Sequence, residues 1–267
     1  MTDRLKLLCV LAHPDDESLG NGGILAKYAA EGVETYLVTA TRGERGWQGI
    51  PEVNPGLDEL GKIREAELHA AAQVLGIREV HFLDYIDGDL DQANPAEAVG
   101  KIVAHIRRIQ PQVVVTFDPF GAYGHPDHIA ICQFTTAAVV QAVDAAYTDG
   151  LPPHRVAKLY YMSDTQRIFD LYFEAFGQII MPVDGVERTG AAWEDWAITT
   201  RPDCEAHWQT VWQAITCHRT QLPGYQKLTE LPESFHREVW GHPTYYRALS
   251  FVNGGRKTET DLFEGLR

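Results

Sequence analysis

The sequence predicts an α/β protein with a Rossmann-like, doubly wound, mostly parallel sheet, helices on both faces of it, and a C-terminal lobe. Continuous apolar runs of strand length occur at residues 5–12 and 113–117, as expected for strands buried on both faces. Segments with helical periodicity lie between such runs. Strands that alternate with helices indicate a parallel sheet, because parallel neighbours need a long crossover connection.

The alternation extends through the first 150 residues. Apolar or β-rich runs predict strands at residues 5–12, 33–41, 80–83 and 113–117. Periodicity predicts helices at residues 23–30, 57–75, 95–109 and 126–146. Gly76 suits a helix C-cap, and Pro95 and Pro126 suit first-turn positions, where no amide donor is needed.

The second half is less regular. It predicts strands at residues 156–162 and 179–183 and a helix at residues 205–219. It contains no linker, repeat or low-complexity tract. We therefore expect one domain over residues 1–267, with the Rossmann-like core and its site in residues 1–150 and a lobe in residues 151–267.

The net charge and the cysteine content limit the kinds of partner and the cellular compartment that we expect. A net charge of −14 repels phosphate backbones and anionic lipids, so neither nucleic acid nor a membrane is expected, and a small-molecule ligand is. None of the four cysteines forms a C-x-x-C pair. With no signal-peptide pattern, this predicts a cytoplasmic protein. The sequence shows no recognisable interface pattern, so it neither predicts nor excludes a homo-oligomer.

Two motifs rich in histidine and aspartate follow predicted strands. They are AHPDDE at residues 12–17 and YGHPDH at residues 123–128. In open α/β sheets, ligand sites form at the carboxyl ends of the strands, where the strand order reverses. If the two preceding strands are neighbours, the motifs face each other.

The residue types suit a catalytic metal. His13, Asp16 and His128 offer two imidazoles and one carboxylate, which leaves one coordination position open. Pro126 places His128 in the first turn of a helix, where the positive helix end disfavours imidazolium. A metal ligand must be neutral imidazole, so this location favours the role.

Three further side chains suit acid and base chemistry. Amide hydrolysis needs a base for the attacking water and a donor for the oxyanion and the leaving amine. Asp15 fits the base. His125 fits the acid, with Asp127 as its orienting partner.

Together the motifs resemble the LmbE-like, or PIG-L, family of zinc-dependent N-acetylglucosamine deacetylases. Shorter segments add to the resemblance: TRGE at 41–44, REAE at 64–67 followed by LG at 75–76, YIDG at 85–88 and HRTQ at 218–221. The resemblance covers residues 5–150, with one further match near residue 220.

The resemblance implies specific roles. It implies zinc, or another divalent ion such as Fe²⁺, on His13, Asp16 and His128, with Asp15 as base and His125, tuned by Asp127, as acid. It places Arg42, Arg64, Asp87 and Tyr123 at the substrate. It also implies that the lobe at 151–267 shapes the choice of substrate.

The function expected is removal of an acetyl or other acyl group from an N-acetylglucosamine-type sugar or sugar conjugate. An amidase acting on a thiol-sugar conjugate is an alternative. A non-haem iron oxygenase would use the same ligand types, but its usual β-barrel setting conflicts with the βα alternation. A non-catalytic nucleotide- or sugar-binding module is disfavoured, since residues 20–23 lack the G-x-G-x-x-G spacing.

Several of these residues also fit ordinary structural roles. Arg64 and Glu67, three apart on a helix, fit a surface ion pair. His218 fits a buried histidine bonded to backbone, and Glu17 fits a residue that supports the first helix or a backbone amide.

Overall fold

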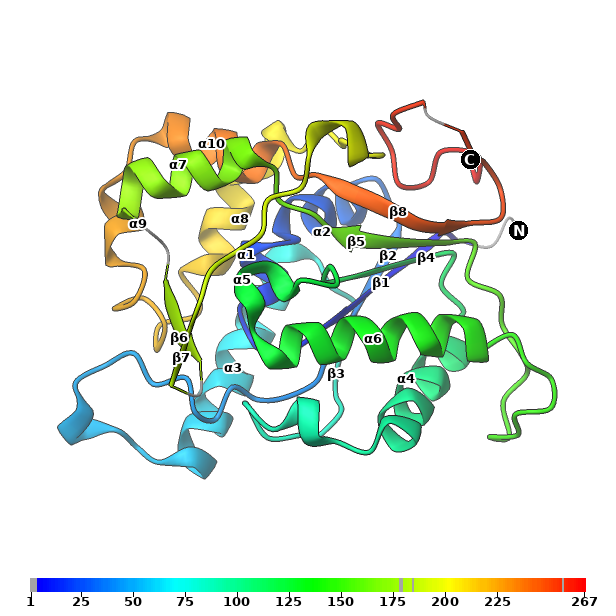
Figure 1. Ribbon diagram of the computed structural model, residues 1–267, viewed down its shortest axis with the longest axis horizontal. Coiled ribbons are helices and arrows are strands. Elements are labelled where there is room, and N and C mark those ends of the chain that lie inside the picture. Colours follow the sequence, from blue (N-terminus) through cyan, green and yellow to red (C-terminus); the bar gives the residue numbers. More distant parts are fainter. Residues whose placement is uncertain (1–3, 178–179, 184, 256) are drawn as a thin grey trace.

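A six-stranded sheet forms the centre of the molecule, as the computed structural model shows for residues 4–177, 180–183, 185–255 and 257–267 (Figure 1). The strands run in the order β3-β2-β1-β4-β5-β8. They are β1 (Lys6–Leu11), β2 (Glu34–Thr39), β3 (Glu79–Phe82), β4 (Val113–Thr116), β5 (Lys158–Met162) and β8 (Tyr245–Ser250). Only β8 among these six is antiparallel to its neighbour. The predicted α/β fold with a mostly parallel sheet is confirmed.

Helices cover both faces of the sheet. On one face α2 (Gly22–Ala30), α3 (Leu57–Leu75) and α8 (Trp208–Ile215) contact one another. On the other, α4 (Pro95–Ile109) packs against α6 (Pro126–Gln141), which runs below the sheet in Figure 1. Shorter elements are α1 (Asp16–Leu19), α5 (Gly121–Gly124), α7 (Gln166–Phe176), α9 (Gln226–Glu230), α10 (Glu233–Gly241) and the hairpin β6 (Met181–Val183) and β7 (Val186–Arg188).

The core lies around the two central strands. Side chains 7–11 of β1 and 113–115 of β4 are fully buried, and α2 and α6 cover opposite faces of the sheet. Each buried leucine or valine contributes about 1.5–3 kcal/mol relative to exposure. This two-sided burial explains why both strands are continuous apolar runs.

The bounds of α3 and α4 match the predicted ranges because their end signals are local. Gly76 adopts the left-handed conformation (φ 74°), and its amide closes the last turn of α3. Asn94 Oδ1 accepts from the amides of Ala96 and Glu97, and Pro95 occupies the first turn of α4.

Helix α6 is shorter than predicted. It ends at Gln141 instead of continuing to residue 146. The buried guanidinium of Arg107, on α4, donates to the carbonyls of Ala142, Asp144 and Tyr147. Those carbonyls are thereby satisfied outside a helix, so the chain turns away there.

The second half adds strands to the same sheet. Strand β5 lies within the predicted 156–162, and β6 lies within the predicted 179–183, of which residue 179 is outside the described residues. The predicted helix 205–219 is a 3-10 turn (Glu205–His207) followed by α8. No prediction covered α7, α10 or β8. Among the described residues, no helix is both long and apolar enough to cross a bilayer.

Candidate active site

Both histidine-containing motifs lie at the carboxyl ends of neighbouring strands. Strands β1 and β4 pair in parallel, with Leu7 opposite Val113. The strand order reverses between them, since β2 and β3 lie on one side and β5 on the other. The predicted meeting of the two motifs at this point is confirmed.

The Nδ1 atom of His13 faces both of the other predicted ligands. Its Nδ1 is 3.1 Å from His128 Nε2 and 3.7 Å from Asp16 Oδ2. Asp16 Oδ1 is 3.6 Å from His128 Nε2. In a tetrahedral site with zinc–nitrogen bonds of about 2.1 Å, ligand atoms lie about 3.4 Å apart. The three side chains therefore fit a zinc-sized ion.

Asp16 is held by the backbone of its own loop. Its Oδ2 accepts from the amides of Ala12 (3.2 Å) and His13 (2.7 Å). Burial raises the pKa of Asp16 to about 7, against the lowering effect of His13. A cation beside this carboxylate would stabilise its ionised form.

The other ring nitrogen of His13 faces two carboxylates. Its Nε2 is 3.1 Å from Asp127 Oδ2 and 3.1 Å from Asp87 Oδ1. Burial opposes protonation, but these carboxylates raise the pKa of His13 well above its ordinary value. Asp127 also accepts from the amides of Gly88 and Leu90. Such outer carboxylates fix the orientation and tautomer of a ligating histidine.

The predicted partner of His125, Asp127, holds it through the backbone. Its Nδ1 accepts the backbone N–H of Asp127 at 3.1 Å, which caps α6. The neutral ring then carries its proton on Nε2. Asp127 thus orients His125 through its amide, while its carboxylate contacts His13.

Two alternative donor sets share His13. The ligand atoms of His13, His125 and His128, and those of His13, Asp87 and Asp127, each lie within 4.8 Å of one another. Asp87 Oδ2 accepts the Arg45 amide, Asp127 accepts two amides, and His125 Nδ1 accepts one. Asp16 also accepts two amides, but at Oδ2 alone, so its Oδ1 stays directed at His128, whereas both oxygens of Asp127 accept amides. The set of His13, Asp16 and His128 therefore suits a metal better.

His128 provides a neutral imidazole. Burial, followed by the neighbouring His13 and His125, lowers its pKa well below the ordinary value. Its ring stacks on Phe117 with centroids 3.8 Å apart. The preceding loop passes so close that a Cβ on Gly121, which has φ 67°, would lie 3.1 Å from His128 Cβ.

Asp15 occupies an unusual backbone position beside these side chains. Its φ of 113° lies in the left-handed region, which costs a non-glycine residue about 1–3 kcal/mol. Its amide donates to Glu17 Oε2 at 3.0 Å, which confirms that Glu17 supports a backbone amide. Its Oδ2 accepts from Tyr225 (2.8 Å) and Arg64 (3.2 Å).

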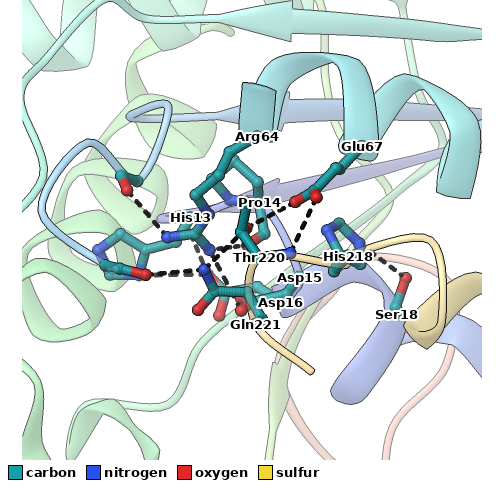
Figure 2. A network of polar contacts seen from close by, with 12 residues as sticks. His13, Pro14, Asp15, Asp16, Ser18, Arg64, Glu67, His218, Thr220 and Gln221 are labelled. Carbon is teal, nitrogen blue, oxygen red and sulfur yellow. Dashed lines mark hydrogen bonds and ion pairs between the residues drawn. The ribbon is translucent and has the colours of Figure 1, made fainter. Parts of the chain in front are cut away.

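The expected surface pair of Arg64 and Glu67 is wrong. Arg64 is 3% exposed and donates to the carbonyls of Pro14 and Gly43 as well as to Asp15 (Figure 2). Glu67 instead accepts from the amide and hydroxyl of Thr220. A Cβ on Gly43, which has φ 68°, would lie 2.1 Å from Arg64 Nη1.

Of the other residues predicted to contact substrate, Tyr123 and Asp87 lie in the cluster around His13, and Arg42 does not. The ring of Tyr123 lies 5.2 Å from that of His128, and burial and nearby carboxylates raise its pKa well above the ordinary value. Asp87, as described, contacts His13. The structure does not bring Arg42 to this cluster: its guanidinium pairs with Glu65 and Asp84.

Two residues of the C-terminal lobe reach the site. His218 is fully buried, as expected. Its Nε2 contacts Glu17 Oε1 at 2.8 Å, whereas a backbone partner had been expected. The HRTQ match was the signal for this residue. Tyr225 was missed, since it is 210 residues from Asp15 and stands in no recognised motif.

A protein-family model described as PIG-L, GlcNAc-PI de-N-acetylase, matches residues 8–139. A 1D-myo-inositol 2-acetamido-2-deoxy-alpha-D-glucopyranoside deacetylase of Thermobispora bispora is 33% identical, over 100% of both chains. A mycothiol S-conjugate amidase of Streptomyces coelicolor is 30% identical, over 100% of this chain and 99% of its own.

The fold also has solved counterparts. N,N'-diacetylchitobiose deacetylase from Pyrococcus horikoshii superposes with a TM-score of 0.69 at 22% identity, over 92% of this chain and 84% of that one. At this identity the likeness concerns the fold.

Proposed function

Because the chain belongs to the PIG-L, or GlcNAc-PI de-N-acetylase, family, we propose that this amide-cleaving hydrolase removes the acetyl group of 1D-myo-inositol 2-acetamido-2-deoxy-α-D-glucopyranoside. We propose zinc as its metal and the cytoplasm as its compartment. We also propose that the whole chain is one domain, whose residues 151–267 shape substrate choice. The full-length similarity to a deacetylase of this substrate supports the assignment.

One observation carries the proposal. A three-ligand donor set and a carboxylate fixed at one oxygen lie together at the ends of two neighbouring strands. The donor set is His13 Nδ1, Asp16 and His128 Nε2, and the carboxylate is Asp15. Metal-dependent amide hydrolysis needs these two components side by side.

Zinc held by these ligands would supply a Lewis acid that polarises the acetyl carbonyl and activates water. Asp15 holds its Oδ2 on Tyr225 and Arg64, so its Oδ1 is the atom that accepts the proton of the attacking water. Because the neutral ring of His125 has one proton only, its Nε2–H hydrogen-bonds to the developing oxyanion, and the proton accepted by Asp15 Oδ1 passes to the departing amine. Tyr123 stays protonated and serves as a second donor.

The experiment is an amine-release assay on a panel of N-acetylglucosamine conjugates. The panel includes the inositol glucosaminide, free N-acetylglucosamine and N,N'-diacetylchitobiose, each with and without added zinc after chelator treatment. We expect release from the inositol glucosaminide that zinc restores. Absence of release from every compound in the presence of zinc would overturn the proposed activity.

A second candidate is amide cleavage in a mycothiol S-conjugate. The full-length similarity to an amidase of such conjugates favours it. A mycothiol S-conjugate in the same assay distinguishes the two. A higher kcat/KM for this compound than for the inositol glucosaminide would make it the principal substrate.

A further inference from the structure

We propose that Tyr225 is a positioning residue for the reaction, holding the carboxylate of Asp15 in the orientation that accepts a proton. The inference rests on the proposed function, in which Asp15 is the base. The two residues are 210 positions apart in the chain, and the Tyr225 hydroxyl donates to Asp15 Oδ2 at 2.8 Å.

The donors around Asp15 are placed asymmetrically. Arg64 Nη2 donates to the same oxygen as Tyr225, at 3.2 Å. Two donors on Oδ2 fix the rotation of the carboxylate about its last bond and direct Oδ1 elsewhere. Arg64 is itself held by two carbonyls, so it cannot follow Asp15 if the carboxylate turns. The hydroxyl of Tyr225 is therefore the second donor that fixes the plane of the Asp15 carboxylate.

The backbone of Asp15 has anchors of its own, separate from those of the side chain. Its left-handed φ of 113° is a conformation that a non-glycine residue keeps only where surrounding contacts enforce it. Glu17 binds the Asp15 amide, and Arg64 binds the Pro14 carbonyl. These contacts fix the main chain, whereas Tyr225 and Arg64 fix the side chain.

Tyr225 is placed by the residues that precede it, which we call the 217–225 segment. Within it His218 contacts Glu17, and Thr220 donates twice to Glu67 of α3. Gln221 donates to the Gly46 carbonyl at 2.7 Å. Figure 2 shows His218, Thr220 and Gln221 beside the loop that carries Asp15 and below the helix that carries Arg64.

The ring and the hydroxyl of Tyr225 have separate partners. The ring packs against the apolar cluster of the lobe that contains Ile215 and Leu228. Burial, followed by the charge of Asp15, raises the pKa of the hydroxyl well above its ordinary value, so the hydroxyl remains a donor. The lobe thus supplies a rigid support for a single hydrogen bond to the base.

The test compares Tyr225→Phe with Tyr161→Phe. Each change removes one hydroxyl from a half-buried tyrosine that makes a 2.8 Å hydrogen bond, and Tyr161 contacts Thr136 on the other side of the sheet. For Tyr225→Phe we expect kcat to fall about 10- to 100-fold with KM within about twofold, because the base is misoriented and ground-state binding is not. Tyr161→Phe should keep both constants.

Metal content and urea unfolding are measured on both variants and should match the wild type. Unchanged kcat in Tyr225→Phe, or a rise in KM alone, would overturn the inference. So would a loss of metal or of stability that accounts for the fall. The wild-type assay separates the two levels: no amine release by wild type overturns the proposed function itself.

A crystal structure of each variant gives a readout that requires no substrate. In Tyr225→Phe we expect the Asp15 carboxylate to rotate from its wild-type orientation, and in Tyr161→Phe we expect it to stay. An Asp15 side chain that is unmoved in Tyr225→Phe would overturn the inference, whatever the assay shows.

Discussion

His13 contacts different partners with its two ring nitrogens. Nδ1 faces Asp16 and His128, and Nε2 faces Asp87 and Asp127. The first group could be predicted from sequence because two short motifs carry it. The second could not, since the direction in which the Asp127 carboxylate points depends on amides of the loop that contains Gly88.

Replacing Asp127 by Asn should weaken metal binding. The change removes the negative charge that faces His13 Nε2 and so lowers the basicity of the ligand. We expect the Kd for zinc to rise about 10- to 100-fold in a chelator-competition titration. Asp91→Asn, at an exposed aspartate next to Leu90 in the chain, is the control. An unchanged Kd for Asp127→Asn would contradict this role.

Replacing Asp15 by Ala should abolish turnover and leave the metal in place. The side chain is the proposed base, and removal of a general base costs about 10²- to 10⁴-fold in kcat. Zinc content by mass spectrometry should equal that of the wild type. Asp58→Ala, on the exposed first turn of α3, is the control. Near-wild-type turnover by Asp15→Ala would remove the base assignment.

Helix ends were predictable where their signals lie in the helix itself. Gly76 ends α3, and Asn94 with Pro95 begins α4, so both predicted ranges match the structure. The end of α6 was not predictable, because the side chain that causes it is Arg107 of another helix. A contact between two helices leaves no periodic pattern in either sequence.

Replacing Arg107 by Met should destabilise the protein strongly. The change leaves the carbonyls of Ala142, Asp144 and Tyr147 without this donor, and a buried acceptor left without its donor costs about 1–3 kcal/mol. Arg108→Met is the matched control, because Arg108 pairs with Glu79 at the surface, where a pair contributes about 0–1 kcal/mol. Urea unfolding measures both. Equal losses of stability in the two variants would refute the proposed role of Arg107 in binding these carbonyls.

At the scale of the whole molecule, the last residues of the chain complete the sheet. Strand β8 pairs with β5, and beyond it the buried Glu259 contacts Lys158 Nζ at 2.6 Å and the hydroxyl of Tyr160 at 2.7 Å. The sequence predicted the first four strands as a parallel sheet from their apolar or β-rich runs, and it predicted β5 as a strand of the lobe. It did not predict β8, whose half-buried residues lack a distinctive pattern, nor an ion pair between residues 101 positions apart.

Replacing Glu259 by Gln should lower the free energy of unfolding by about 3–5 kcal/mol at neutral pH, since Lys158 is left buried without its counter-charge. Burial by itself raises the pKa of Glu259, but hydrogen bonds from Lys158 and Tyr160 outweigh burial and lower that pKa to about 2. A folded-state pKa below the unfolded one means that the contribution is full above about pH 4.5 and disappears as the pH falls toward 2.

The difference between wild type and Glu259→Gln should therefore shrink between pH 5 and about pH 2.5, as urea unfolding at a series of pH values will show. Glu264→Gln is the control, because the Glu264 carboxylate pairs with the exposed Lys257. A difference that stays constant over this range would contradict the assignment.

The position of β5 and β8 in the sheet has a consequence for biosynthesis. A ribosome that has made only the first 150 residues exposes the four strands β3-β2-β1-β4, with the β4 edge unpaired. A bare edge of a parallel sheet is a site of aggregation. Asp15 also lacks its Tyr225 contact until the last fifth of the chain emerges. We therefore expect the nascent protein to be prone to aggregation and inactive until these segments have emerged.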